Sequence, residues 1–311
     1  MLCIENNAIR EQALLLCESI RRFGGRHSNA PILAFSPRPG LGVDASTRKA
    51  MADMGVEYVD EPLNTICPAY GSANRVFAAA WAETHTDTDF IVVLDSDTVF
   101  LDEPALPLDA DVAVRPVDSK GSATSGAGDL FEDNWNKLAE LCGTSVEQLP
   151  YMQTTIDKER IRASYNGGLV VTRRSLGILT RWAELFARSV NEGLRPYRGQ
   201  GINIHASTGH VGHTASEYWG SNQAALALTI WATTNRVVHY PDSYNIPLHL
   251  IASEGKIDRK WQINSPVHLH YHWMFEQRHH EMALEIIEQL GVQTDRMEWL
   301  VQHVPFTRQN P

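Results

Sequence analysis

The stretch of sequence that decides the fold is Asp89-Phe90-Ile91-Val92-Val93-Leu94-Asp95-Ser96-Asp97-Thr98-Val99-Phe100-Leu101-Asp102. It begins with an apolar run, Phe90–Leu94, whose composition is typical of a central strand buried on both faces. Asp95-Ser96-Asp97 follows directly, and a second apolar run, Val99–Leu101, comes next. A solvated turn needs no apolar segment on both sides, so we expect the acidic residues to lie at the end of a buried strand.

Asp95 and Asp97 are candidate metal ligands. In an open parallel sheet, ligands bind at the carboxyl ends of the strands. Two carboxylates one residue apart at that edge can bind one hard cation, and Mg²⁺ and Mn²⁺ prefer oxygen ligands and keep positions open for phosphates. The alternative for a bare Asp-x-Asp is a capping or solvated turn.

The elements around this stretch predict an α/β fold with a mostly parallel central sheet and helices on both sides. The expected strands are Leu2–Glu5, Pro31–Phe35, Val56–Val59, Phe90–Leu94, Asp111–Arg115, Leu169–Val171, Val237–His239 and Val267–His272. The expected helices are Ile9–Phe23, Ser46–Met54, Asn74–Glu83, Leu176–Val190, Ser221–Trp231 and Glu276–Leu290. Residues 118–164 and 193–215 are interpreted as insertions, the first with short helices of its own.

Composition excludes several classes of protein. The chain has 311 residues, 43% hydrophobic and 21% charged, as in an ordinary globular protein. A net charge of −10 without a basic cluster argues against a nucleic-acid partner. The longest apolar runs are too short to span a membrane, and no secretion signal is visible, so we expect a cytoplasmic protein. The four cysteines are scattered, without a CxxC pair, which argues against a zinc–thiolate site.

Other polar residues are candidates with open alternatives. His268, His270 and His272 alternate with apolar residues, so a strand would place all three on one face, as metal ligands or as a polar edge. Arg75 is interpreted either as a bidentate diphosphate clamp or as part of a surface salt bridge. Gln223 lies in the first turn of a helix with Ser221 as its expected N-cap, and either contacts a ligand or is a surface amide.

Several motifs resemble, in order, those of glycosyltransferases with the GT-A fold. The resemblance is greatest to glycosyltransferase family eight, the glycogenin and bacterial galactosyltransferase group. The motifs are Asn74-Arg75, Leu94-Asp95-Ser96-Asp97, Tyr165-Asn166-Gly167-Gly168, Asn222-Gln223 and the strand that contains His270. Each is short, and their combination and order across residues 2–273 give the resemblance its specificity.

The resemblance implies an enzyme that transfers a sugar from a nucleotide diphosphate sugar, with a UDP-sugar favoured, to a glycan or other hydroxyl acceptor, with retention. It implies Mn²⁺ or Mg²⁺ bound by Asp95, Asp97 and His270, with His268 as the second choice of histidine. Gln223 and Asn222 would be catalytic. The donor would contact Glu5, Asn74, Arg75, Ser96, Asn166, Gly167 and Gly168.

The resemblance also implies one domain over residues 1–311, with a nucleotide half (1–115), an acceptor half (116–275) and a C-terminal helical tail (276–311). The motifs depart from the family pattern in three places: Asn222 stands for an Asp, Arg75 for a Lys, and His272-Trp273 follows the late strand where a Lys is usual. Glu217 and Asp242 are candidate bases for an inverting variant. Trp135, Trp219 and Trp273 either stack on the acceptor or belong to the core.

Three other functions stay open. The first is a nucleotidyltransferase, although its usual Gly-rich basic loop is absent from residues 5–10. The second is a metallohydrolase that uses the three histidines with Asp97. The third is a sugar-binding relative without catalytic activity, which the departure at Asn222 permits.

Overall fold

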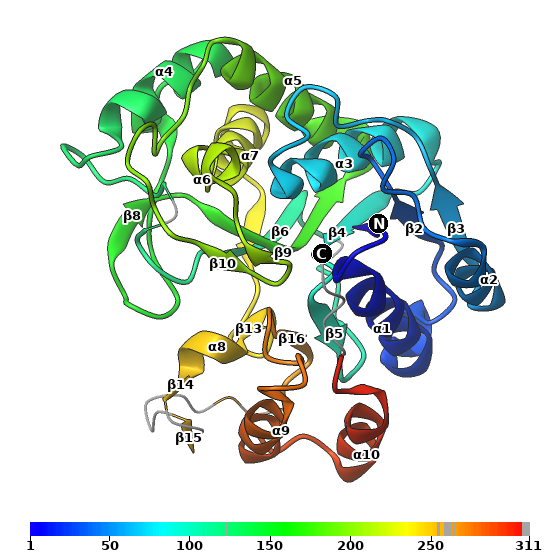
Figure 1. Ribbon diagram of the computed structural model, residues 1–311. Helices are drawn as coiled ribbons and strands as arrows, with labels where there is room; N and C mark the ends of the chain where they lie inside the picture. The colour runs from blue at the N-terminus through cyan, green and yellow to red at the C-terminus, as the bar shows by residue number, and fades with distance from the viewer. Residues whose placement is uncertain (108, 122, 254–255, 258–262, 264, 307–311) are drawn as a thin grey trace.

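The computed structural model describes residues 1–107, 109–121, 123–253, 256–257, 263 and 265–306 (Figure 1). The first third alternates strands and helices, as the sequence predicts. Its elements are β1 (Leu2–Cys3), α1 (Ile9–Phe23), β2 (Ile32–Phe35), α2 (Ala45–Asp53), β3 (Val56–Val59), α3 (Asn74–His85) and β4 (Phe90–Leu94). Each strand here is short, and its apolar residues lie between helices.

One sheet runs through the molecule. Strands β1, β2 and β3 pair in parallel. β1 meets β4 through two hydrogen bonds, from the Met1 amino group to Val92 O (2.7 Å) and from Leu94 N to Met1 O (3.0 Å). The sheet continues as β4, β9 (Tyr165–Arg173), β6 (Val112–Pro116) and β12 (Val237–His239). Only β9 among these strands pairs antiparallel with its neighbours, so the predicted mostly parallel sheet is confirmed.

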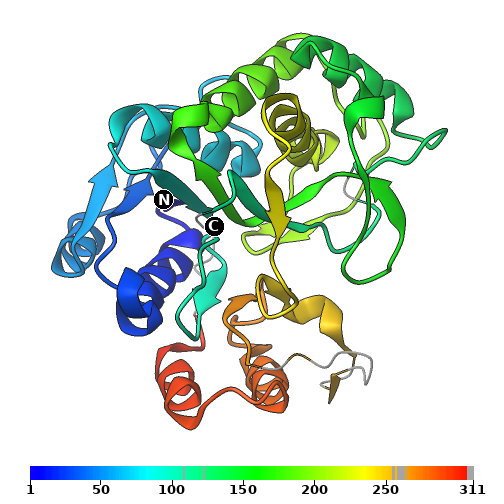
Figure 2. The same ribbon diagram turned by 180° about the vertical axis from the view of Figure 1, so that it is seen from behind.

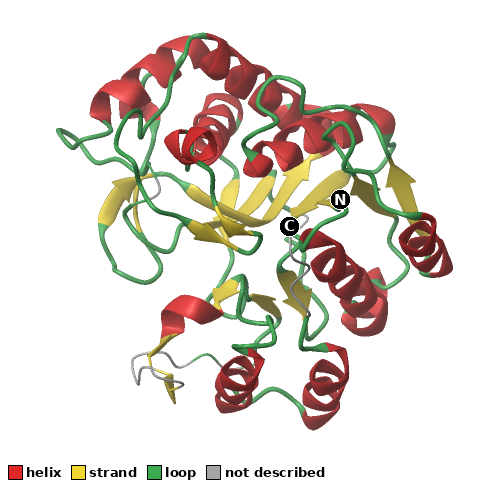
Figure 3. Ribbon diagram, viewed as in Figure 1, coloured by secondary structure: helices red, strands yellow, loops and turns green. Residues whose placement is uncertain are grey.

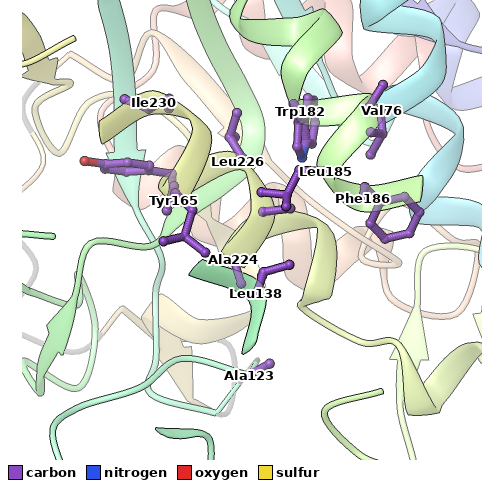
Figure 4. Packing of buried hydrophobic residues seen from close by; sticks show 14 of the residues in the cluster. Val76, Ala123, Leu138, Tyr165, Trp182, Leu185, Phe186, Ala224, Leu226 and Ile230 are labelled. Atoms are coloured by element: carbon purple, nitrogen blue, oxygen red, sulfur yellow. The ribbon is translucent and has the colours of Figure 1, made fainter. Parts of the chain in front are cut away.

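Helices cover both faces of this sheet (Figure 3). One face carries α3, α4 (Glu132–Cys142), α5 (Ile178–Asn191) and α7 (Ser221–Thr233). Trp182, Leu185 and Phe186 of α5 pack there with Leu226 and Ile230 of α7, and all five side chains are buried (Figure 4). The other face carries α1, which packs on β1 and on α2. Burial on both faces explains the continuous apolar run of β4.

A smaller unit lies on the side of the sheet away from α4 and α5 (Figure 2). Its sheet has the order β13 (Ile246–Pro247), β16 (His268–His270) and β5 (Thr98–Phe100). It is completed by α8 (Leu248–Ile251), α9 (His280–Gln289) and α10 (Thr294–His303), with the short strands β14 (Ala252–Ser253) and β15 (Lys256–Ile257). β5 directly follows Asp97, so Asp95-Ser96-Asp97 connects the large sheet to the small one.

The insertions have structure of their own. Residues 118–164 contain α4 and the hairpin β7 (Tyr151–Gln153) and β8 (Arg160–Arg162). The region 193–215 contains the hairpin β10 (His205–Ala206) and β11 (Gly209–His210), and α6 (His213–Glu217) begins in it. No helix in the part of the chain that the structure describes is long and apolar enough to cross a membrane.

Several predicted boundaries are wrong. The late strand ends at His270, because His272 has a positive φ of 53° and turns the chain. The next helix begins at His280 instead of Glu276. Ser221 is the first residue of α7, and its N-cap is Gly220 (φ 78°), so the predicted Ser221 cap is wrong. The last five residues of the predicted C-terminal tail, 307–311, lie outside the described residues.

Candidate functional site

A pocket of about 530 Å³ lies at the carboxyl end of β4, a volume within the range of small-molecule sites. Most of the predicted site residues line it: Asn74, Arg75, Asp95, Ser96, Asp97, Asn166, Asn222, Gln223 and His270. Glu5, Gly167 and Gly168 do not line it and lie behind its wall. The structure therefore gathers residues that are far apart in the sequence around one cavity.

Asp97 is held between the two sheets. β5 pairs antiparallel with β16, which places Thr98 opposite His270. The bond from Tyr271 N to Asp97 O (3.1 Å) extends this pairing, and the bond from Asp95 N to Gly168 O (3.3 Å) extends the pairing of β4 with β9. The Ser96 hydroxyl donates to Cys3 O of β1. The acidic turn is therefore fixed from three strands.

Asp97 meets two imidazoles. His270 Nε2 lies 3.3 Å from Asp97 Oδ1, and His272 Nδ1 lies 3.4 Å from Asp97 Oδ2. The rings of His270 and His272 stack at 4.0 Å, and His249 of α8 meets His272 edge-on, also at 4.0 Å. One donor atom from each of Asp97, His270 and His272 lies within 4.8 Å of the others. These three residues are a candidate divalent metal site.

Burial and proximity set the charges of this group. Burial raises the pKa of Asp97, but the neighbouring His270 and His272 outweigh it and hold the pKa below its usual value. Burial lowers the pKa of His270, and the Asp97 carboxylate raises it above the ordinary value. Burial, with His270 nearby, lowers the pKa of His249 to about 4 and holds that of His272 well below its usual value. His249 and His272 are therefore neutral at pH 7, the form that binds metals.

His268 does not belong to this group. Its side chain is fully buried, its Nδ1 accepts a hydrogen bond from Asn245 N (3.2 Å), and its ring packs on Phe100 at 4.4 Å. Burial lowers its pKa to about 3. The expectation that three histidines share one strand face is wrong, because the strand ends at His270 and only His270 and His272 lie beside Asp97.

Asp95, the other acidic residue of the turn, forms an ion pair with Arg75. The Arg75 side chain is 11% exposed and lines the pocket, so the predicted surface salt bridge is instead a mostly buried pair with Asp95, and the role as a diphosphate clamp stays a prediction. Burial lowers the pKa of Arg75, while Asp95 raises it above the ordinary value. A Cβ at Gly167 would lie 2.5 and 2.6 Å from the Arg75 terminal nitrogens, so any larger residue there would force the guanidinium to move.

Asn222 and Gln223 have different surroundings. The Asn222 amide is buried and occupied, because its Oδ1 accepts from Tyr70 Oη (2.9 Å) and its Nδ2 donates to Ser72 O (3.2 Å). Gln223 lines the pocket, and within the described residues its side chain has no hydrogen-bond partner. Gln223 is therefore the amide of the pair that can bind a ligand, whereas Asn222 fixes the start of α7 against residues 70–72.

Two buried networks support the pocket wall. Glu5 is fully buried and accepts from Arg38 Nε (2.7 Å) and from Asn74 Nδ2 (3.0 Å), so Asn74 also faces this carboxylate. On the opposite wall, Asn166 Nδ2 donates to Asp118 Oδ2 (2.8 Å), and Asn166 Oδ1 accepts from Gly168 N (2.9 Å). The other carboxylate oxygen of Glu5 accepts from Asn7 Nδ2 (3.2 Å) and from Arg38 Nη2, so both oxygens of this carboxylate are bound within the protein.

Asp118 and His249 are pocket residues that the sequence prediction missed. Burial raises the pKa of Asp118 above its usual value. A sequence signal for Asp118 exists in its position, because it lies just after strand β6, as Asp95 lies just after β4. His249 lies on a four-residue helix, α8, and no periodic pattern in the sequence points to it.

The remaining candidates divide between the pocket and the rest of the molecule. Trp219 and Trp273 line the pocket. Trp135 is fully buried, with Nε1 donating to Ala123 O (2.8 Å), and belongs to the core. Glu217 accepts from Arg195 (2.7 Å) and Gly199 N (3.0 Å), and Asp242 pairs with Arg115 (2.9 Å). Neither carboxylate lines the pocket, which argues against both as an inverting base.

Comparison with models of protein families identifies a family to which the chain is similar. The family model described as the Rhodobacterales glycosyltransferase domain matches residues 1–197. A search among curated proteins found no match. Among solved structures, the bifunctional glycosyltransferase WbbM in its apo form is similar with a TM-score of 0.50 and 13% identity, covering 97% of this chain. This chain spans 51% of the WbbM chain, so the likeness concerns about half of that protein and shows a shared fold.

Two further structures match with lower scores. LgtC with an active-site substitution has a TM-score of 0.47 and 12% identity, covering 96% of this chain and 98% of LgtC. Core-mannan synthase A from Aspergillus fumigatus, in its Mn/GDP form, has a TM-score of 0.47 and 8% identity, covering 77% of this chain and 71% of the synthase.

Proposed function

The chain belongs to the family of Rhodobacterales glycosyltransferase domains, and we propose that it transfers a sugar from a nucleotide diphosphate sugar to a hydroxyl acceptor with the help of a divalent metal. The observation that carries the proposal is the meeting of Asp97, His270 and His272 at the edge of a pocket at the carboxyl end of β4. Such a position is where ligands bind in open α/β sheets.

The residues at this edge fit a divalent cation. Their donor atoms lie within 4.8 Å of one another, and two of the three side chains are buried, so few waters compete for them. Mn²⁺ suits a mixed set of nitrogen and oxygen donors, and Mg²⁺ is the second choice. A cation bound by Asp97 and His270 supplies positive charge against the negative charge that develops on the departing diphosphate.

The donor and the acceptor are proposed to occupy different halves of the chain. The nucleotide lies against residues 1–115, with Asn74 near the base, held from behind by Glu5, and with Ser96 at the acidic turn; UDP is the favoured nucleotide. The sugar lies against Asn166, with Gly167 and Gly168 of β9 behind this wall of the pocket. The acceptor lies against residues 116–275, where Trp219 and Trp273 line the pocket. The predicted C-terminal tail, residues 276–311, is proposed to take neither role. The cytoplasmic location expected from the sequence stays a prediction.

Transfer with retention is the stereochemistry that these residues favour. The pocket offers Gln223, whose side-chain amide has no hydrogen-bond partner among the described residues, and the residue before it is Asn222 instead of an Asp. In front-side transfer, the acceptor oxygen bonds to the anomeric carbon as the bond to the diphosphate breaks. The acceptor proton passes to an oxygen of the leaving diphosphate. Gln223 orients the sugar by hydrogen bonding near the anomeric carbon.

Release of nucleoside diphosphate from a panel of nucleotide sugars, with Mn²⁺ or EDTA, tests the proposal. We expect one donor class to react in Mn²⁺, and Asp97→Asn to lose at least about 100-fold in rate, because a metal ligand is removed. Asp87→Asn, an exposed residue before β4, is the matched control and should react like wild type. No release from any donor, or equal rates for Asp97→Asn and wild type, would contradict the proposal.

One observation favours a second function. Two imidazoles and one carboxylate are also a set that metallohydrolases use with zinc. Tightly bound zinc, together with hydrolysis of a substrate that is not a nucleotide sugar and no release in the donor panel, would support this alternative.

A further inference from the structure

We propose that Arg38 and Gln12 read the base of the nucleotide and that this pair of side chains selects pyrimidines over purines. This rests on the proposed function, because it takes the occupant of the pocket to be a nucleotide diphosphate sugar. Both residues line the pocket, and neither belongs to the motifs of the sequence. Glu5 then holds Arg38 in place and does not touch the base.

The base end of the pocket lies two strands away from Asp97. β1 pairs with β2 on one side and meets β4 on the other, so the sheet edge runs from Asp97 after β4, past Cys3 of β1, to Arg38 after β2. Neighbouring strands are about 4.8 Å apart, which places Arg38 roughly 10 Å from Asp97 along this edge. The sugar is proposed to lie on the other side of β4, against β9. The nucleoside of a diphosphate at the acidic turn therefore extends toward the loops after β1 and β2.

Arg38 is fixed by three hydrogen bonds and keeps N–H groups for a ligand. Its Nε donates to Glu5 Oε1 (2.7 Å), its Nη2 donates to Glu5 Oε2, and its Nη1 donates to Pro68 O (3.2 Å). Each Nη carries a second hydrogen, and neither of these has a partner among the described residues. The side chain is 20% exposed and lines the pocket. Arg38 therefore offers the pocket hydrogen-bond donors and no acceptor.

Glu5 is the positioning residue for Arg38. It is fully buried, and its carboxylate also accepts from Asn74 Nδ2 (3.0 Å) and from Asn7 Nδ2 (3.2 Å). If this carboxylate turned to a ligand, Arg38 would lose the partner of its charge, which is costly for a buried pair. Glu5 therefore fixes the plane of the guanidinium and leaves the base to Arg38.

Gln12 supplies the second part of the site. It lies in the first turn of α1, is 3% exposed and lines the pocket, and its Oε1 is buried without a partner within the described part of the chain. Buried polar groups in folded proteins nearly always have a hydrogen-bond partner, so this amide points to a ligand that supplies one. Asn6 N donates to Leu41 O (3.0 Å), which joins the loop before α1 to the loop that carries Arg38.

Together, the two side chains present three hydrogen-bonding positions. The Gln12 amide offers an acceptor and a donor side by side, in either order, because a half-turn exchanges its ends. Arg38 adds a donor at one end. A matching base has an acceptor at that end, followed by a donor and an acceptor in either order. Uracil and thymine present O2, N3–H and O4, and cytosine presents O2, N3 and the N4 amino group. Each of these pyrimidines matches.

Purines do not match this pattern. Adenine has a C–H group beside N1, where Arg38 needs an acceptor. Guanine presents O6 to Arg38, but N1–H and the N2 amino group are then two donors in succession, and the Gln12 amide has only one acceptor. A bound purine would therefore leave a polar group of the site without a partner, which we expect to weaken binding at least about tenfold.

Calorimetric titration of the full chain with UDP, CDP, GDP and ADP in Mn²⁺ tests the proposal. The wild type should bind the better pyrimidine nucleotide at least about tenfold more tightly than either purine nucleotide. Two variants remove the base contacts. Gln12→Leu keeps the size of the side chain, and Glu5→Gln combined with Arg38→Met leaves no buried charge unpaired. In both, the preference should fall below about threefold, while the affinity for inorganic pyrophosphate in Mn²⁺ should not change.

The matched control is Gln302→Leu, at an exposed position outside the pocket, which should keep the preference of the wild type. Urea unfolding separates a ligand-binding role of Gln12 from a structural one. Removal of a buried amide without a partner should leave the urea midpoint of Gln12→Leu unchanged or raise it. A lower midpoint would show that the amide stabilises the fold and would count against its role in base recognition.

Three results would overturn the proposal. They are a wild type that binds none of the four nucleotides, a wild type that binds GDP or ADP as tightly as UDP and CDP, and folded variants that keep the wild-type preference. Circular dichroism shows whether each variant is folded. A preference for UDP or for CDP agrees with the proposal and shows which end of the Gln12 amide faces Arg38.

The test is separate from the test of the proposed function. If the panel of nucleotide sugars reacts while nucleotide binding ignores the base, the proposed function stands and the role of Arg38 and Gln12 fails. If the panel gives no release while pyrimidine nucleotides are preferred and both variants lose the preference, the base-reading role stands and the proposed function fails.

Discussion

Gly167→Ala is expected to destabilise the protein by displacing Arg75. The added Cβ would lie 2.5 and 2.6 Å from Arg75 Nη2 and Nη1, whereas ordinary contact begins at 3.4 Å, so the guanidinium must retreat by about 1 Å. The guanidinium ends a flexible side chain, but it is 11% exposed and paired with Asp95. A retreat of this size displaces the guanidinium from its place beside Asp95 and weakens the pair.

The expected change in the free energy of unfolding combines a loss from the weakened ion pair with a gain from replacing glycine in a strand. Loss of one member of a buried pair costs about 3–5 kcal/mol, and we take about 2–3 kcal/mol here because Asp95 is 21% exposed and partly screened. Replacing glycine in a strand with alanine returns about 0.5–1 kcal/mol. The free energy of unfolding should therefore fall by about 2 kcal/mol.

Urea unfolding, followed by tryptophan fluorescence, measures this change as a lower midpoint with an unchanged slope. The matched control is Gly121→Ala, because a Cβ there meets no atom within 4 Å, and it should shift stability by less than about 0.5 kcal/mol. In an Arg75→Ala background, Gly167→Ala should cost nothing further. The reasoning is refuted if Gly167→Ala and Gly121→Ala unfold at the same urea concentration.

Three further predictions concern pH, helix capping and catalysis. Burial lowers the pKa of His268 to about 3, so below pH 6.5 the unfolded chain binds a proton that the folded chain does not. The free energy of unfolding therefore decreases as the pH is lowered, by up to about 1.4 kcal/mol per pH unit. His268→Gln should reduce the drop in melting temperature between pH 7.5 and 5, and an equal drop would contradict this. Glu83 accepts from Leu179 N (3.0 Å) and Thr180 N (2.8 Å) at the start of α5, so Glu83→Ala should cost about 1–2 kcal/mol in urea unfolding. Exposed Glu184→Ala should cost less than about 0.5 kcal/mol, and equal costs would contradict the capping role. Gln223→Ala should lower kcat about 10- to 100-fold and leave the affinity for Mn²⁺ unchanged. The control Gln302→Ala, at an exposed position, should have the kcat of the wild type. An unchanged kcat in Gln223→Ala would show that Gln223 has no part in the mechanism.

The sequence predicts the large sheet well because burial leaves a pattern in it. Phe90–Leu94 is apolar throughout, and the structure places this strand between two helical layers. The expected resemblance to glycosyltransferases of the GT-A fold is confirmed by the family model and by the WbbM structure. Short strands leave less pattern: β5 and β13 have three and two residues, and neither was predicted as a strand.

The site was only partly predictable, because the group that each polar side chain contacts depends on distances between residues far apart in the sequence. The residues around Arg75 in the sequence do not show whether its guanidinium binds a phosphate or Asp95. That depends on the space beside Gly167, which lies far along the chain. Nor does alternation distinguish His268 from His272. The first is buried against Phe100, and the second lies beside Asp97 because of a single positive φ.

Isothermal titration with UDP, GDP, ADP, CDP and dTDP, in Mn²⁺ and in EDTA, tests the central claim most directly. We predict that one of these nucleotides binds in Mn²⁺ and binds at least about tenfold more weakly in EDTA, a difference of about 1.4 kcal/mol. Asp97→Asn should show only the weak binding in either buffer. The account is contradicted if none of the five binds, or if binding is the same with Mn²⁺, with EDTA and in Asp97→Asn.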